Sequence, residues 1–403
     1  MISRTKANYS IFSLAKSLFL RENNEKYRQE IARKLEHLLG SSYILLTASG
    51  RGALYLLLLS IPRAKVFIPA YTCKAVVEAA LLAGKSVYFG ESELDGFNMD
   101  TNISEEQIDK DTILIVTHQF GIPCQLEPLI NLAHQKGAFV IEDAAASLGS
   151  KIGGQLTGTF GDASFFSFDS TKLLNVPLKG GFLWIRDPDI FAQCQEVYIQ
   201  NTSPMPLLRK FYYLTLGFAL RFVEQPTLYR VFHNIKFHWR GRFTEDSAAF
   251  SPHLNPFYYD RFSEWQAAIL IPQLDRFDQI IANRRRLYNT YLLQLAQASF
   301  FSLPPHDIMQ EWAPIRFPIR VLSNKMQFYE EAVRRGVDFA FSFTFLASPS
   351  SFAISHKLAD TILDLPFYDR LSEHEQMRVI SVLLSIDKIM REIWHDESIV
   401  KND

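Results

Sequence analysis

The sequence predicts an α/β protein built on a mostly parallel sheet that helices cover on both faces. Short apolar runs recur in its first half, helical patterns separate most of them, and the runs are apolar at consecutive positions. Consecutive apolar positions are typical of parallel strands, which are buried on both faces. The predicted strands are KVFIPAY (65–71), SVYFGES (86–92), TILIVTH (112–118), AFVIEDA (138–144) and GGFLWIR (180–186).

The elements around these strands follow from local patterns. YILLTASGRGALYLLLLSI, which begins at residue 43, predicts a strand, a small Gly/Ser turn and a helix. LEPLINLAHQKG (126–137) predicts a helix between two strands. The segment 24–39 predicts a helix, because its apolar residues have helical spacing: Tyr27, Ile31, Leu35, Leu38 and Leu39.

A smaller α+β region is predicted to follow. Residues 262–295 indicate one or two long amphipathic helices. A strand at 315–322 and helices at 325–336 and 372–386 complete the chain.

The composition excludes several classes of protein. The chain has 403 residues, a formal net charge of −1 and 48% apolar residues, which indicates a large folded protein of one or two domains. A near-neutral charge balance argues against a nucleic-acid binder, which needs a basic surface. Cys73, Cys124 and Cys194 are too widely spaced for a disulfide framework or a thiolate metal site, so no metal is predicted.

The chain is also expected to be cytoplasmic. Lys16 interrupts the apolar stretch near the start and no small-residue cleavage site follows, so no signal peptide is predicted. The best candidate for a membrane span, FYYLTLGFAL (211–220), is too short to cross a bilayer.

Residues 206–243 differ from the rest of the chain. They hold ten aromatic residues, and seven basic residues against one acid give them a net charge of +6. One interpretation is a peripheral membrane contact, since basic and aromatic side chains suit an anionic interface. The other is an insertion that packs against a partner subunit or covers the active site.

Three features fit one cofactor. Asp143 ends an apolar strand, and ligands bind at the carboxyl ends of parallel strands. Lys172 follows a second apolar run, SFFSFDS. The turn at 49–52 opens a helix whose free N–H groups and dipole attract an anion. Pyridoxal phosphate needs an amine, a carboxylate for its ring nitrogen and a phosphate cradle, and these residues supply all three.

The order of the motifs resembles the DegT/DnrJ/EryC1/StrS family of sugar aminotransferases, which have pyridoxal-phosphate fold type I. The resemblance covers about 27–186 and about 255–388. It implies an N-terminal segment (1–20), a large cofactor-binding domain with a mostly parallel seven-stranded sheet (21–270) and a smaller α+β domain (271–403). The motifs are TASGRGALYLLLL, VFIPAYTCKAVVEAALLAGKSVYF, VTHQFGIPCQLEPLINLAHQKGAFVIEDAAASLGS, TGTFGDASFFSFDSTKLLNVPLKGG and LDLPFYDRLSEHEQMRVISVL.

The resemblance also implies roles at matching positions. Lys172 would form a Schiff base with the cofactor and later move the proton, and Asp143 would pair with the pyridinium nitrogen. Ser167 would donate to the phosphate, together with N–H groups of Gly50 to Gly52. The family has a dehydratase branch in which histidine replaces the lysine, so Lys172 favours the transaminase branch.

Several positions depart from the family pattern. Ala146 stands where a glutamine usually touches the phenolic oxygen of the cofactor, and Cys73 where an aromatic ring often stacks on it. Arg51 replaces a threonine of the phosphate turn, and its guanidinium either contacts phosphate or points into solvent. Lys179 replaces an acid, and Ser342-Phe343 replaces a His-Tyr pair that often faces substrate.

One further position leaves two alternatives open. His118 follows the strand at 112–117, where it either contacts substrate or is a structural histidine with its hydrogen bonds satisfied.

The resemblance implies a homodimer with shared active sites, in which an asparagine usually reaches the partner's phosphate. The segment with that asparagine appears here as Tyr259-Asp260-Arg261-Phe262-Ser263.

The sequence therefore predicts a pyridoxal-phosphate-dependent aminotransferase. The expected donor is glutamate and the expected acceptor is a keto sugar linked to a nucleotide. The changed substrate-facing positions keep a second hypothesis open, in which the same fold and cofactor act on a non-sugar or lipid-linked substrate. A third hypothesis is a non-catalytic relative that serves as a binding partner, and the retained Asp143 and Lys172 count against it.

Overall fold

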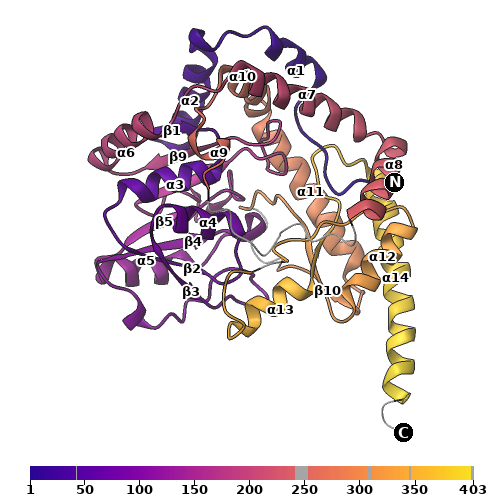
Figure 1. Ribbon diagram of the computed structural model, residues 1–403. Coiled ribbons are helices and arrows are strands. Elements are labelled where there is room, and N and C mark those ends of the chain that lie inside the picture. Colours follow the sequence, from indigo (N-terminus) through magenta and orange to yellow (C-terminus); the bar gives the residue numbers. More distant parts are fainter. Residues whose placement is uncertain (42, 241–252, 306–310, 345, 401–403) are drawn as a thin grey trace.

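The computed structural model describes residues 1–41, 43–240, 253–305, 311–344 and 346–400. In Figure 1 the main sheet occupies one half of the molecule, and the C-terminal helices and short strands occupy the other. The segment singled out at 206–243 is described as far as residue 240.

A seven-stranded, mostly parallel sheet forms the larger half, which confirms the predicted fold class. Its order is β1-β9-β8-β5-β4-β2-β3, and only β9 runs against its neighbours. The strands are β1 (Ile44–Thr47), β2 (Lys65–Pro69), β3 (Ser86–Gly90), β4 (Thr112–Thr117), β5 (Phe139–Asp143), β8 (Ala163–Ser167) and β9 (Gly181–Ile185).

Helices cover both faces of this sheet, which explains the consecutive apolar residues of its strands. On β4, Ile113 and Ile115 join one core with α3 (Gly50–Ser60) and α4 (Lys74–Leu82). The intervening Leu114 and Val116 join another core with α5 (Leu126–Gln135). Successive side chains on a strand point to opposite faces, so a strand covered on both sides must be apolar at every position.

The C-terminal part is built on a small antiparallel sheet of β10 (Phe301–Ser302), β11 (Pro318–Val321) and β12 (Ile362–Asp364). The predicted amphipathic stretch at 262–295 forms two helices, α10 (Glu264–Leu274) and α11 (Phe277–Leu295). The other helices here are α12 (Lys325–Arg334), α13 (Ala353–Thr361) and α14 (Glu373–Val400).

The N-terminus lies against the C-terminal part. Ile2 forms a parallel bridge with Val337 and is buried in the core of that part. The chain then runs through α1 (Ile11–Leu18) and α2 (Lys26–Leu39) to the main sheet. The domain limits at residues 20 and 270 stay a prediction.

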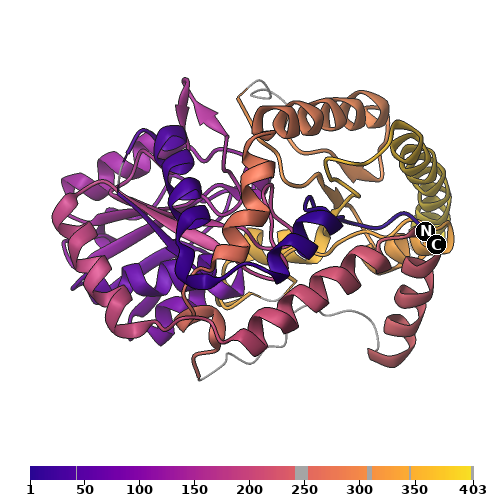
Figure 2. The ribbon, with the colours of Figure 1, turned by 90° about the horizontal axis from the view of Figure 1, so that it is seen from above.

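The aromatic, basic segment forms two helices, α7 (Leu207–Val223) and α8 (Pro226–Arg240), which follow α6 (Pro188–Asn201). Figure 2 shows α7 running beside α1. Three of the basic residues whose side chains the structure describes form ion pairs: Arg209 with Asp260, Lys210 with Glu22 at 3.8 Å, and Arg221 with Glu224. In the part of the chain that the structure describes, no helix is long and apolar enough to cross a membrane.

The backbone of β9 passes very close to the turn that opens α3. A Cβ built on Gly181 would lie 2.5 Å from Gly50 N, 2.6 Å from Ser49 C and 2.7 Å from Phe166 O, all of them backbone atoms. Backbone atoms held by a sheet and a helix cannot move aside as a side chain can. Only glycine therefore fits at position 181 without displacing the turn.

We expect Gly181→Ala to lower the free energy of unfolding by about 1–3 kcal/mol, the usual effect of overpacking. Urea titration would measure this loss. Gly180→Ala is the matched control, because its Cβ would meet side-chain atoms of Phe168 and Val176, at 3.1 and 3.2 Å. Equal stability of the two variants would contradict the close backbone approach.

Candidate active site

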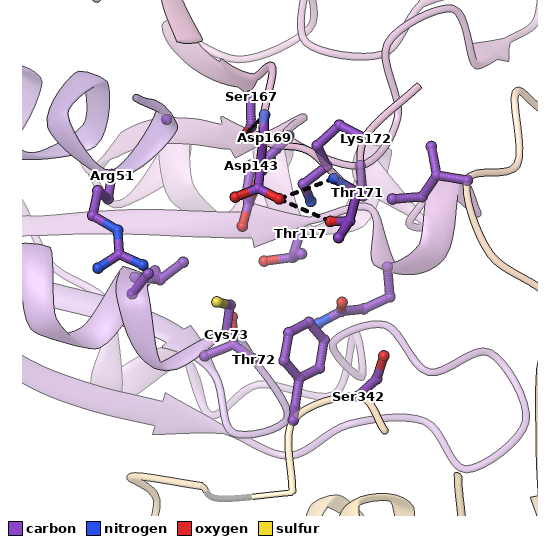
Figure 3. A pocket seen from close by; sticks show the side chains of 18 of the residues that line it. Arg51, Thr72, Cys73, Thr117, Asp143, Ser167, Asp169, Thr171, Lys172 and Ser342 are labelled. Carbon is purple, nitrogen blue, oxygen red and sulfur yellow. Dashed lines mark hydrogen bonds between the residues drawn. The ribbon is translucent and has the colours of Figure 1, made fainter. Parts of the chain in front are cut away.

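A cavity of about 460 Å³ lies at the carboxyl ends of the parallel strands. Residues at or just after the ends of β2, β4, β5 and β8 line it, together with the start of α3 and two segments of the C-terminal part, 315–316 and 341–343. Figure 3 shows Asp143, Ser167 and Lys172 on one side and Thr72, Cys73 and Ser342 on the other. The carboxyl edge of a parallel sheet is where α/β proteins bind ligands.

Asp143 and Lys172, the two residues predicted to hold the cofactor, both line this cavity. Asp143 is the last residue of β5, and its carboxylate accepts a hydrogen bond from Ala145 N at 3.1 Å. Two hydrogen bonds fix the main chain at Lys172. Its N–H donates to Asp169 O at 2.9 Å, and its carbonyl accepts from Asn175 Nδ2 at 3.0 Å. The structure therefore brings together a carboxylate and an amine that are 29 residues apart in sequence.

Burial changes the acidity of both groups. It lowers the pKa of Lys172, although the nearby Asp143 carboxylate acts in the opposite direction. It raises the pKa of Asp143, and here the charge of Lys172 opposes the change. A lower lysine pKa increases the fraction of neutral amine, which is the form that attacks a carbonyl or accepts a proton.

The turn before α3 leaves two amides for an anion. Ser49 caps the helix, since its Oγ accepts from Gly52 N at 2.9 Å, and Ala53 N makes the next bond, to Ser49 O at 2.9 Å. The N–H groups of Gly50 and Arg51 precede these bonds, at the positive end of the helix dipole.

Of the predicted phosphate-turn residues, Gly52 has a different role. Its N–H is engaged by Ser49, and it does not line the cavity. A Cβ at Gly52 would lie 2.5 Å from Phe257 O, so this glycine permits close packing of α3 against the backbone of α9 (Pro256–Tyr259). The predicted phosphate contact therefore fails for the Gly52 amide and remains possible for its two predecessors.

Ser167 and Arg51 complete this end of the cavity. A Cβ built on Gly50 would lie 3.0 Å from Ser167 Cβ, so the serine at the end of β8 lies directly beside the turn. The Arg51 side chain lines the cavity and is 25% exposed, with Nη1 3.4 Å from a Glu78 carboxylate oxygen. The arginine is thus tethered at the cavity and does not simply extend into solvent.

Two hydroxyl groups support the presence of a polar ligand. Thr72 Oγ1 and Thr117 Oγ1 are buried, line the cavity and have no hydrogen-bond partner within the described residues. A buried hydroxyl without a partner is costly, so such groups usually serve a ligand or water. Together with the carboxylate, the amine and the anion-binding turn, they fit the polar outline of pyridoxal phosphate.

The remaining predicted cofactor and substrate positions, except His118, also reach the cavity. Cys73, Ala146, Lys179 and Ser342 line it. Burial raises the pKa of the Cys73 thiol, which keeps it neutral. Lys179 pairs with Asp169. Burial alone would raise the pKa of Asp169, but the charge and hydrogen bond of Lys179, with the Thr171 N–H and the charge of Lys172, together lower the pKa to about 2.

His118 is a structural residue. It is fully buried and does not line the cavity. Its Nδ1 accepts a hydrogen bond from Cys124 N at 3.0 Å, so Nε2 carries the proton and donates to Glu142 at 3.0 Å. With both nitrogens engaged in the protein, His118 has no free group for a substrate, which corrects its assignment as a substrate residue.

Sequence reasoning missed a network from the C-terminal part. Arg316 and Ser342 both line the cavity, and both contact one carboxylate oxygen of Asp364, at 2.7 and 2.5 Å. Arg316 is also close enough to Lys172 to help lower its pKa. No sequence signal marked Arg316, because it lies within the ordinary strand pattern predicted at 315–322.

The segment expected to reach a partner subunit is engaged within its own chain. Asp260 pairs with Arg209, whose guanidinium also lies over the Tyr259 ring, 5.8 Å from its centroid. A homodimer with shared sites stays a prediction.

Known proteins resemble this chain over most of its length. The family model for the DegT/DnrJ/EryC1/StrS aminotransferases matches residues 11–384. GDP-perosamine synthase of Escherichia coli O157:H7 is 29% identical over 48% of this chain, and the match spans only 54% of that enzyme. A dTDP-3-amino-3,4,6-trideoxy-alpha-D-glucose transaminase of Micromonospora megalomicea is 23% identical over 92% of this chain and 91% of its own.

The fold comparison agrees. The crystal structure of NtdA from Bacillus subtilis with its cofactor PMP bound has a TM-score of 0.69 with 20% identity, over 94% of this chain and 82% of that one. The family match, the seven-stranded sheet and a cavity that joins Asp143, Lys172 and the helix-opening turn lead to one conclusion. The chain belongs to the DegT/DnrJ/EryC1/StrS aminotransferase family.

Proposed function

We propose that this chain is a pyridoxal-phosphate-dependent aminotransferase that transfers an amino group from glutamate to a nucleotide-linked keto sugar. The observation that carries the proposal is the cavity itself, in which Lys172 and Asp143 lie with an anion-binding helix start. The names of the relatives, which include GDP- and dTDP-sugar enzymes, support the substrate class.

When bound, pyridoxal phosphate supplies an electron sink that stabilises negative charge at the carbon bearing the amine. Asp143 would hold the ring nitrogen, and the start of α3, Arg51 and Ser167 would hold the phosphate. Lys172 would move a proton through its Nζ, and its lowered pKa keeps a useful fraction of that amine neutral. Burial of these groups strengthens their electrostatic effects.

Arg316 is the best candidate to bind a carboxylate of the donor. It lines the cavity and its charge is felt at Lys172, so it is close to the reacting amine. A guanidinium binds a carboxylate with two parallel hydrogen bonds. Its contact with Asp364, at 2.7 Å, would hold the planar group in place for the donor.

Two aromatic side chains form an apolar wall of the cavity. Phe120 and Phe343 both line it, with ring centroids 6.3 Å apart and planes inclined by 25°. Both residues have left-handed backbone, at φ +59° and +49°. Such strain in non-glycine residues clusters at functional sites. A flat apolar wall suits one face of a sugar ring.

The Lys172→Ala variant tests the proton-transfer role. We expect conversion of the bound cofactor to its amine form by glutamate to slow at least about 100-fold, the usual contribution of a positioned base. Stopped-flow absorbance would measure it in purified, cofactor-loaded protein. Lys151→Ala, on an exposed β-hairpin, is the control. Wild-type speed in Lys172→Ala protein would refute the assignment.

The Arg316→Ala variant tests the donor site. We expect the KM for glutamate to rise about ten- to 100-fold, because a charge-assisted hydrogen bond is lost. The reaction with a simple amine that lacks a carboxylate should be nearly unchanged. Arg316→Lys should raise the KM for glutamate less than Arg316→Ala does. Arg320→Ala, which removes an ion pair with Asp95, should leave that KM unchanged. Equal effects on both donors would show that Arg316 only supports the fold.

A panel of acceptors tests the substrate class. Turnover of nucleotide-linked keto sugars by purified protein, with no turnover of other ketones, is the expected result. Turnover confined to non-sugar or lipid-linked ketones would replace the proposed substrate class and keep the proposed chemistry. If the protein binds no pyridoxal phosphate, both the proposed substrate class and the proposed chemistry are refuted.

A further inference from the structure

Helices α1, α7 and α8 carry a concentration of exposed large apolar side chains. On α7 the outward row is Leu208, Phe211, Tyr212, Thr215, Ala219 and Phe222, which recur at helical spacing. Leu208 is 85% exposed and Phe222 66%. Phe12 on the neighbouring α1 is 78% exposed. We call these three helix faces the apolar face.

The outward row of α7 contains no charged residue. The charged side chains of this helix lie to its sides or beneath it, where Arg209, Lys210 and Arg221 pair with acids or backbone of the same chain. A helix face that water covers normally carries charges. An uncharged face with exposed phenylalanine therefore indicates contact with something other than water.

Helix α8 also exposes apolar side chains. Tyr229 and His233 hold the helix on the C-terminal part, since the Tyr229 hydroxyl bonds to Asp338 and His233 Nε2 lies 3.2 Å from the Tyr329 hydroxyl. Leu228, Val231, Phe232 and Ile235 remain exposed, at i, i+3, i+4 and i+7.

Helix α8 also contributes to a cationic groove. Arg230 of α8 lines it with residues of α12, α14 and the turn after α12: Arg334, Arg335, His374, Met377, Arg378, Ser381 and Val382. Glu331 pairs with Arg334 and Arg335. Within the described residues Arg230 and Arg378 have no acidic partner. Burial lowers the pKa of the Met1 amino group, and the charges of these two arginines lower it further. Clustered cations repel one another, and an anion would relieve the repulsion.

The two features together indicate the surface of an anionic bilayer. Exposed phenylalanine and leucine on paired helices enter the interface between headgroups and acyl chains, and arginines beside them meet lipid phosphates. A second copy of the chain would cover the apolar side chains, whereas lipid phosphates also supply the anion that Arg230 and Arg378 lack within the described residues.

We propose that the apolar face and the cationic groove form a docking surface for an anionic membrane. The apolar face enters the lipid interface and the groove binds phosphate headgroups. The surface does not include the catalytic cavity, so membrane binding and amino transfer are separable properties of the protein.

Flotation of the full chain with vesicles tests this proposal. The vesicles are phosphatidylcholine alone or phosphatidylcholine mixed with phosphatidylglycerol. We expect binding to the anionic vesicles only, weakened by salt. Arg230→Gln/Arg378→Gln should weaken it about 30-fold, since each basic residue near an anionic surface contributes about a fivefold effect. Phe211→Ser/Phe222→Ser should weaken it at least about tenfold.

Matched controls lie away from the surface. Leu293→Ser removes a 77% exposed apolar side chain from α11, and Lys151→Gln removes an exposed cation. Both should bind like the wild type, and all variants should keep the same melting temperature and cofactor spectrum. Absence of wild-type binding to anionic vesicles would overturn the proposal. Dissociation of a dimer by Phe211→Ser/Phe222→Ser, seen by sedimentation, without any vesicle binding would assign the face to a second copy.

Discussion

The arrangement of the site depends on two adjacent carboxylates at the end of β5. Strand alternation sends Glu142 and Asp143 to opposite faces of the sheet. Glu142 is fully buried and accepts hydrogen bonds from Gly158 N, Phe160 N and Gly161 N, at 2.6–2.8 Å, besides the one from His118. These hydrogen bonds connect β5 to the loop before β8. Strand β8 carries Ser167. Asp143, one residue later, is left to face the cavity.

The buried hydrogen bonds of Glu142 explain why polar residues that look equivalent in the sequence have different roles in the structure. His118 and Thr117 are neighbours at the end of β4, yet the histidine completes the buried network and the threonine hydroxyl lines the cavity. The same separation holds at the phosphate turn. Ser49 and Gly52 use their groups to cap and pack α3, so the amides left for an anion are those of Gly50 and Arg51. Residues with a structural role and residues that line the cavity are thus immediate neighbours in the sequence.

The C-terminal part supplies the remainder of the cavity. Arg316 and Ser342 line the cavity and both bond to the Asp364 carboxylate, and Arg316 is close enough to Lys172 to help lower its pKa. The aromatic, basic segment shows a related effect on the outer surface. Its charge of +6 in sequence is partly neutralised, because Glu22 and Asp260, far away along the chain, pair with Lys210 and Arg209. Among the described side chains of this segment, the exposed ones on α7 are chiefly apolar, and Arg230 of α8 joins the groove.

The sequence by itself determined the doubly covered parallel sheet, the family, and the central pair Asp143 and Lys172. Those properties follow from local patterns, namely consecutive apolar residues on strands and motifs of fixed spacing. Only the tertiary structure decided that His118 is structural, that Gly52 serves packing, and that Arg316 reaches the cavity. The reason is physical: the spacing of residues indicates secondary structure, but their hydrogen-bond partners and exposure depend on other segments that folding brings to them, such as Glu142 beside His118 and Phe257 beside Gly52.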